Sequence, residues 1–269
     1  MKTPGRRTAR KGTAAVAENA DPSKTEAAIR RVVELAGGMD WLKPGQSVVI
    51  KPALNSTHSF PFTASPASCA ALVRMCLERG AKKVYVADET GFEHTLLKHW
   101  KTGHFAGFEK DQTIKSFKKT GIWAAVRAVG VELGAADRIH VTTFREAGWR
   151  RHELRPDAGR SASGGFALHS DWVREQLKGA EKLGGGTARR KYLPRLFDKT
   201  RGPSKAGLWV PTLLDEADHI INVFRVSTHV WSHFTMAIKN WVGIMRPDDR
   251  AWMHQLNYLK NNRHSRCGL

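Results

Sequence analysis

Short runs of apolar and β-branched residues alternate along the chain with longer segments of helical pattern. Three runs stand out, at residues 47–50 (SVVI), 83–87 (KVYVA) and 219–224 (HIINVF). Apolar runs of this length, bounded by turn residues, are typical of strands buried on both faces of a parallel sheet. The segment between the first two runs is long enough for the helical crossover that parallel pairing requires. The pattern predicts an α/β fold, with a mostly parallel, layered sheet and flanking helices.

Helical spacing and helix-end signals complete this outline. We expect helices over residues 23–36, 66–79, 113–129 and 233–245, and a further strand over residues 139–144. The helix over residues 113–129 is expected to flank a site rather than to pack in the core.

Two segments depart from this globular pattern. Residues 1–22 begin with a cluster of Lys and Arg without any acidic residue in the first twelve positions, and we predict a disordered basic tail. Residues 146–206 contain glycine pairs and triplets together with a second basic cluster. We predict that they form a long irregular basic insertion within a single α/β domain over residues 23–269.

The chain is strongly basic, with 44 Lys and Arg residues against 25 Asp and Glu residues and a formal net charge of +19. The clusters in residues 1–12 and 178–205 would attract polyanions such as nucleic acid. No DNA- or RNA-binding motif accompanies them, and the tryptophans are scattered instead of forming a stacking platform. A solvated basic surface and a nucleic-acid-binding surface both stay open.

Several classes of protein are excluded by motifs that the sequence lacks. Three cysteines without a Cys-x-x-Cys pair make neither a disulfide scaffold nor an in-chain iron–sulfur motif. The usual glycine-containing motifs of dinucleotide, P-loop and serine-hydrolase sites are also missing. No apolar run approaches the roughly 20 residues of a membrane span, so no membrane partner is expected. Because Arg6-Arg7 is followed by no apolar signal-peptide stretch, we expect a cytoplasmic protein.

Polar side chains follow each of the three buried runs. They are Lys51 and Asn55 after the first run, Asp88 after the second, His229 after the third, and Lys239 and Asn240 on the helix behind it. Ligands of open α/β sheets bind at the carboxyl ends of strands, near a reversal of strand order, so these residues are expected to converge. The set suits an anionic small molecule, or a cation held by Asp88 and His229. His229, Lys239 and Asp88 are the candidate catalytic residues, and Lys51, Asn55 and Asn240 the candidate ligand-binding residues.

His229 and His233 are candidate metal ligands. Their x3 spacing would place both imidazoles on one face if the segment were helical. Asp88 or His254 would supply a third ligand, whereas a histidine pair without one is more often not a metal site. Both interpretations stay open.

Three segments, KPGQSVVIKPALN, TASPASCAALVRMCLERGAKKVYVADE and HIINVFRVSTHVWSHFTMAIKNWVG, resemble the domain-of-unknown-function family numbered 362. Members show an I-K-P-N-type strand end, a Thr-x-Pro helix start and a T-x-x-x-K-N-x-x-G helix. The matching positions here are Lys51, Pro52, Asn55, Thr63, Pro66, Asp88, Asn222, His229, Thr235, Lys239, Asn240 and Gly243. The resemblance implies an α/β fold with a site at these positions, and it adds Thr63 and Thr235 as cofactor-binding residues.

The chain also departs from that family pattern. Many members carry a ferredoxin-like cysteine module that is missing here, so the resemblance implies a redox or cofactor-related role with an iron–sulfur partner protein. The family's Lys-x-Lys before Thr-His is Arg225-Val226-Ser227 in this chain. The sequence stops before a further acidic strand and a Gly-Pro turn, from which we expect a truncated or divergent member.

The leading hypothesis is therefore a protein that binds an anionic small molecule or metal-containing cofactor at the strand ends. A basic nucleic-acid-binding protein and a non-catalytic remnant are the alternatives.

Overall fold

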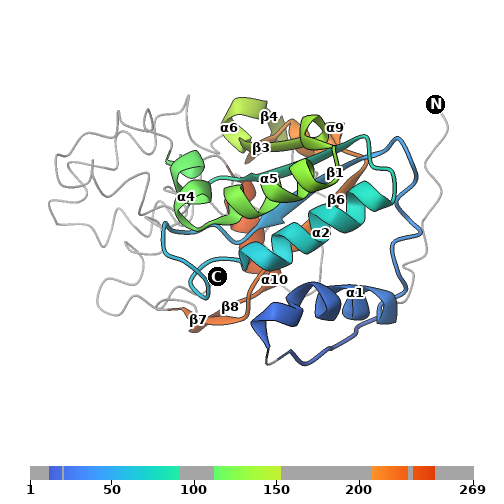
Figure 1. The fold of residues 1–269 in the computed structure, drawn as a ribbon. Coiled ribbons are helices and arrows are strands. Elements are labelled where there is room, and N and C mark those ends of the chain that lie inside the picture. The colour runs from blue at the N-terminus through green and yellow to red at the C-terminus, as the bar shows by residue number, and fades with distance from the viewer. Residues whose placement is uncertain (1–11, 20, 91–111, 153–207, 230–232, 246–269) are drawn as a thin grey trace, which may run out of the picture.

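A four-stranded parallel sheet runs through the centre of the protein (Figure 1). The computed structural model describes residues 12–19, 21–90, 112–152, 208–229 and 233–245. The strands lie in the order β3-β2-β1-β6, with all three pairings parallel. Their bounds are Ser47–Pro52 for β1, Lys83–Asp88 for β2, Ile139–Thr143 for β3 and His219–Val223 for β6. The predicted α/β class and the parallel arrangement of the three apolar runs are confirmed.

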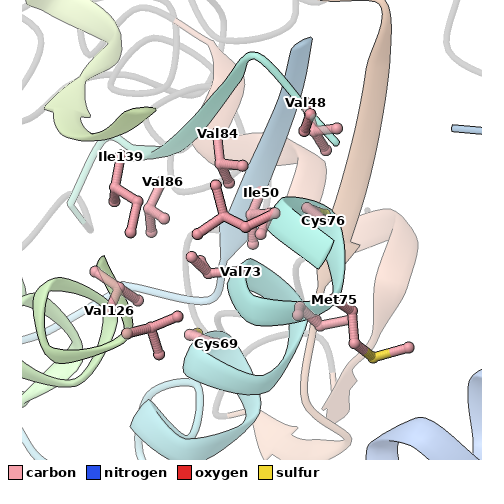
Figure 2. Packing of buried hydrophobic residues seen from close by; sticks show 14 of the residues in the cluster. Val48, Ile50, Cys69, Val73, Met75, Cys76, Val84, Val86, Val126 and Ile139 are labelled. Carbon is pink, nitrogen blue, oxygen red and sulfur yellow. The ribbon is translucent and has the colours of Figure 1, made fainter. Parts of the chain in front are cut away.

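One face of the sheet is covered by helices. They are α1 (Thr25–Leu35), α2 (Pro66–Glu78), α4 (Thr113–Lys119) and α5 (Ile122–Glu132), with short 3-10 turns at Pro22–Lys24 and Ala136–Arg138. Helix α2 packs on β1 and β2, and α5 packs on α2 and β3. Figure 2 shows apolar side chains of α2 and α5 meeting those of the three strands. Both α2 cysteines, Cys69 and Cys76, lie in this core, where burial raises the pKa of each thiol to about 12.

The segment predicted as one helix over residues 113–129 is two helices. Gly121 lies between α4 and α5 with a φ of 82°, a conformation that interrupts a right-handed helix and favours glycine. Phe117, Ile122 and Val126 are fully buried in the core. The expectation that this segment flanks a site instead of packing in the core is therefore wrong.

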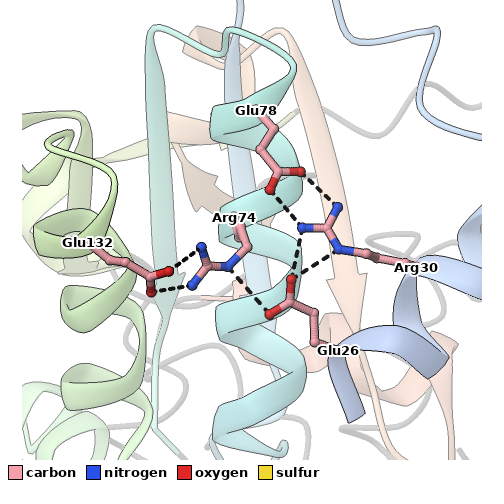
Figure 3. A network of polar contacts seen from close by, with 5 residues as sticks. All are labelled: Glu26, Arg30, Arg74, Glu78 and Glu132. Atoms are coloured by element: carbon pink, nitrogen blue, oxygen red, sulfur yellow. Dashed lines mark hydrogen bonds and ion pairs between the residues drawn. The ribbon is translucent and has the colours of Figure 1, made fainter. Parts of the chain in front are cut away.

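Charged side chains tie the outer surfaces of α1, α2 and α5 together (Figure 3). Arg30 of α1 reaches Glu78 of α2 at 2.7 Å and Glu26 at 2.8 Å. Arg74 of α2 bridges to Glu132 of α5 and approaches Glu26 at 3.4 Å. The network spans all three helices without entering the core.

A smaller layer covers the opposite face of the sheet. Its elements are α6 (Phe144–Ala147), β4 (Trp149–His152), β5 (Leu208–Pro211) and α9 (Leu213–Glu216). Phe144 and Leu213 are buried there against Val49 and Ala87 of the sheet. Strands β4 and β5 pair antiparallel, and β4 lies inside the range predicted for the insertion. Residues 153–206 of that insertion, and residues 1–11 and 20 of the predicted tail, lie outside the described residues.

The chain after β6 differs from the predicted helix over residues 233–245. Strands β7 (Ser227–His229) and β8 (His233–Thr235) form an antiparallel hairpin, followed by the short helix α10 (Ala237–Asn240) and the 3-10 turn η3 (Trp241–Ile244). The predicted helix therefore forms only over residues 237–244, as α10 and η3, whereas residues 233–235 pair with β7 as a strand. In the described part of the chain, none of the helices has the length and apolar character needed to span a membrane.

Candidate functional site

The strand order reverses between β1 and β6. The chain proceeds outward from β1 to β2 and β3, and β6 then joins the other edge of β1. Lys51, near the end of β1, is the Cα partner of Asn222 in β6. Paired residues of neighbouring parallel strands face the same side of a sheet, so these two side chains emerge together at the reversal. This is where ligands bind in open α/β sheets.

A buried ion pair occupies this position. Lys51 Nζ lies 2.8 Å from Asp88 Oδ1, and the two side chains are only 1% and 3% exposed. Lys51 Nζ also donates to the carbonyl oxygen of Pro52 at 3.1 Å and to Asn240 Oδ1 at 3.3 Å. An ammonium group has three N–H donors, which these three acceptors match.

The carboxylate of Asp88 also accepts hydrogen bonds from backbone N–H groups. Its Oδ1 also accepts from the backbone N–H of Glu89 at 2.8 Å, and Oδ2 accepts from the backbone N–H of Leu54 at 3.0 Å. Asp88 therefore joins the ends of β1 and β2 through backbone donors as well as through Lys51. Hydrogen bonds to the ionised form and a nearby cation both favour a charged carboxylate.

Two asparagines set the direction of the hydrogen bonds behind Lys51. Asn222 Nδ2 donates to the carbonyl oxygen of Ala237 at 3.0 Å, which leaves its Oδ1 to accept from Asn240 Nδ2 at 2.6 Å. The amide of Asn240 is thereby oriented with its oxygen toward Lys51. A backbone carbonyl of α10 thus determines, through two amides, that Lys51 meets an acceptor.

Gly243 allows η3 to pass directly over the ion pair. A Cβ atom at this position would lie 2.7 Å from Asp88 Oδ1 and 2.8 Å from Lys51 Nζ. No side chain fits in that space. The matched positions Lys51, Asp88, Asn222, Asn240 and Gly243 therefore form one contiguous cluster.

The remaining predicted site residues lie on the loop after β1, on β8 and on α10. Asn55 is exposed, and Thr235 is the Cα partner of Ser227 in the hairpin. Thr63 is fully buried, and its hydroxyl donates to the carbonyl oxygen of His58 at 2.9 Å, which fixes the loop after β1. Lys239 is half-buried on α10. The neighbouring Ile238 is 88% exposed.

His229 and His233 are cross-strand partners in the β7–β8 hairpin. The two residues therefore lie on strands and not on the helix that their metal-ligand interpretation assumed. Their side chains, and His254, lie outside the described residues. Among the residues that the structure does describe, no group of three or more His, Cys, Asp or Glu residues is arranged to hold a metal ion.

Sequence reasoning missed a second buried polar group beside Asp88. Glu89 is 1% exposed, with its Oε1 3.6 Å from Arg145. Thr90 follows it, with its N–H donating to Thr113 Oγ1 at 2.9 Å and its hydroxyl 3.2 Å from that of Ser116. The Asp-Glu-Thr sequence after β2 was a visible signal. The helical partners were not, because nothing in the sequence says which face of α4 turns toward the sheet.

Comparison with known proteins adds one match. A family model described as Domain of unknown function (DUF362) matches residues 48–154 and 195–263. The matched segments include the ends of β1, β2 and β6 and the α10–η3 segment that make the cluster. No curated protein and no solved structure matches the chain.

Proposed function

Since the chain belongs to the family of the domain of unknown function DUF362, we propose that it binds an anionic small molecule or a metal-containing cofactor at the carboxyl ends of its parallel strands. The observation that carries this proposal is the buried Lys51–Asp88 pair at the reversal of strand order. Burying two charges costs more than a surface pair returns, so such a pair at this edge is better explained by a site than by stability.

Within this proposal the ion pair is the floor of the site. Lys51 and Asp88 hold the ends of β1 and β2 together, and Asn240 fixes the α10 segment over them. Lys239 and His229 are then the candidates for contact with the ligand, since both lie on the chain that follows β6. A histidine there would serve as general base or ligand. A redox or cofactor-related role with an iron–sulfur partner protein belongs to the same proposal.

The test begins with the full chain as purified. Elemental analysis and mass spectrometry of released small molecules would identify a metal or an anion that travels with the protein. We expect Lys239→Ala and His229→Ala to lose that molecule while their melting temperatures stay close to that of the wild type. Lys115→Ala, which removes an exposed lysine from α4, is the matched control and should retain it.

Two results would contradict the proposal. A large fall in the melting temperature of Lys239→Ala or His229→Ala would show that the residue stabilises the fold and is not needed only for ligand binding. Wild-type protein that carries neither metal nor small molecule, and that binds no added oxyanion, would support the non-catalytic remnant instead.

The net charge of +19 favours nucleic-acid binding as a second candidate function. Affinity for a DNA duplex, measured by fluorescence anisotropy, should then fall steeply with salt as phosphate contacts are lost. Deleting residues 1–22 should weaken binding and reduce the salt slope. Lack of binding at low salt would end this candidate.

A further inference from the structure

Arg225 stands apart from the other arginines of the structure. It lies half-buried two residues beyond the end of β6, and within the described part of the chain it has neither a hydrogen bond nor an ion pair. Every other arginine whose side chain the structure describes has a carboxylate or carbonyl partner: Arg30, Arg31, Arg74, Arg79, Arg127, Arg138, Arg145 and Arg150.

Arg225 is less exposed to solvent than the two apolar residues beside it, although a charged side chain would normally be the more exposed. The apolar residues on either side, Phe224 and Val226, are 41% and 71% exposed, whereas the charged residue between them is withdrawn from solvent. Burial without a compensating partner lowers the pKa of Arg225. A guanidinium stays protonated in proteins, so the result is a charge whose lost hydration nothing in the described protein replaces.

The position of Arg225 relates it to the strand-end cluster. The carbonyl oxygen of Val223, the last residue of β6, accepts from the N–H of Ala53 at 2.9 Å, and Val223 is the Cα partner of Pro52. Arg225 therefore leaves the sheet at the same edge as Lys51 and the loop after β1. Lys51 already meets three acceptors there, so it can contact an added anion only by giving one of them up.

We infer that Arg225 is the anion-binding residue of this site and that it takes a carboxylate or phosphate group. This inference rests on the proposed function and names the group that recognises the ligand. The planar fork of a guanidinium matches two oxygens of either oxyanion with parallel hydrogen bonds. A lysine at the same place offers a point charge without that geometry.

The test is isothermal titration of the full chain with orthophosphate and, separately, with succinate. The two arms distinguish a phosphate from a carboxylate ligand. We expect the wild type to bind one of them and Arg225→Met to bind it at least about tenfold more weakly. Arg225→Lys should fall between the two. Arg31→Met removes the same charge from the exposed surface of α1 and should bind like the wild type.

A second readout separates a binding residue from a structural one. Methionine keeps the apolar stem and removes an unpaired charge, so the melting temperature of ligand-free Arg225→Met should equal or exceed that of the wild type. A clear fall would overturn the inference. So would equal binding by Arg225→Met and Arg31→Met, or no binding of either oxyanion by the wild type.

The outcomes also separate this inference from the proposed function. If Lys239→Ala and His229→Ala lose a co-purifying molecule that Arg225→Met retains, the strand-end function stands and the assignment of Arg225 falls. If only Arg225→Met loses oxyanion binding, Arg225 stands and the roles of Lys239 and His229 fall.

Discussion

Two groups of opposite charges hold this protein together in different ways. On the helical layer, Arg30, Glu78 and Arg74 belong to a network whose members remain partly in water, with side-chain exposures of 35%, 41% and 17%. At the strand ends, Lys51 and Asp88 are almost completely buried and are surrounded by backbone and amide partners. Water screens the first group and not the second, so equal distances do not mean equal energies.

The comparison shows what burial of an ion pair demands. In the surface network, water can hydrogen-bond to those polar atoms of the side chains that have no protein partner. The buried pair accepts hydrogen bonds from the backbone N–H groups of Leu54 and Glu89, and it donates to the carbonyl oxygen of Pro52 and to the amide oxygen of Asn240. Chain segments that are far apart in sequence therefore meet at the strand-order reversal. Burying two charges there costs desolvation free energy, and a ligand site would explain why the fold retains them.

Breaking the buried pair should have the largest effect. Lys51→Met leaves the Asp88 carboxylate buried without its cation, and we expect a loss of about 3–5 kcal/mol in the free energy of unfolding. Urea denaturation measures this loss. The double variant Lys51→Met/Asp88→Asn should lose less than the sum of the two single variants, because the uncompensated charge is gone. Single-variant losses below about 1 kcal/mol would show that water reaches the pair.

Crowding the buried pair without changing its charges should have the next largest effect. In Gly243→Ala the new methyl group would lie 2.7 Å from Asp88 Oδ1, so η3 must move away. We expect a loss of about 1–3 kcal/mol, measured by the same denaturation. Gly12→Ala is the control, because a Cβ atom there meets nothing within 4 Å. Equal stability of the two variants would mean that η3 does not press on the pair.

The strands and the Lys51–Asp88 pair could be predicted from the sequence because the patterns that indicate them are local. The apolar runs at β1, β2 and β6 are long, unbroken and bounded by turns, so strand type and parallel pairing followed from them. The strand-end rule then brought Lys51 and Asp88 together correctly. Each of these inferences needed only neighbouring residues and one general rule of topology.

Features that depend on packing were less accessible. The helix predicted over residues 233–245 forms only from Ala237 onward, because residues 233–235 pair with β7 as a strand, and the sequence alone does not show that pairing. Gly121 gave too weak a signal to divide the segment into α4 and α5. The isolation of Arg225 has no counterpart in sequence, because whether a charge finds a partner is decided only by the folded structure.

Breaking the surface network should have a much smaller effect than breaking the buried pair. Arg30→Met removes the partner of Glu26 and Glu78, whose side chains are 44% and 41% exposed. Exposed pairs contribute about 1 kcal/mol or less each, so we expect a loss of that order in the free energy of unfolding. The loss should shrink further in 1 M salt, whereas that of Lys51→Met should not. A salt-independent loss would mean that Arg30 acts through packing of its stem instead.

The smallest expected effect is a difference in acid sensitivity between wild type and Arg30→Met. Arg30 holds the pKa of Glu78 below its usual value, mainly through its hydrogen bond to the carboxylate. A group whose pKa is lower in the folded than in the unfolded state stabilises the fold above its unfolded value, near 4.5, and loses that contribution as pH falls through the folded value. Between roughly pH 5 and 3, the wild type should therefore lose stability slightly more steeply than Arg30→Met. Urea denaturation at stepped pH measures both slopes, and the carboxylates that do not contact Arg30 cancel in the comparison. Parallel curves would mean that solvent screens the pair so fully that Arg30 does not influence the titration of Glu78.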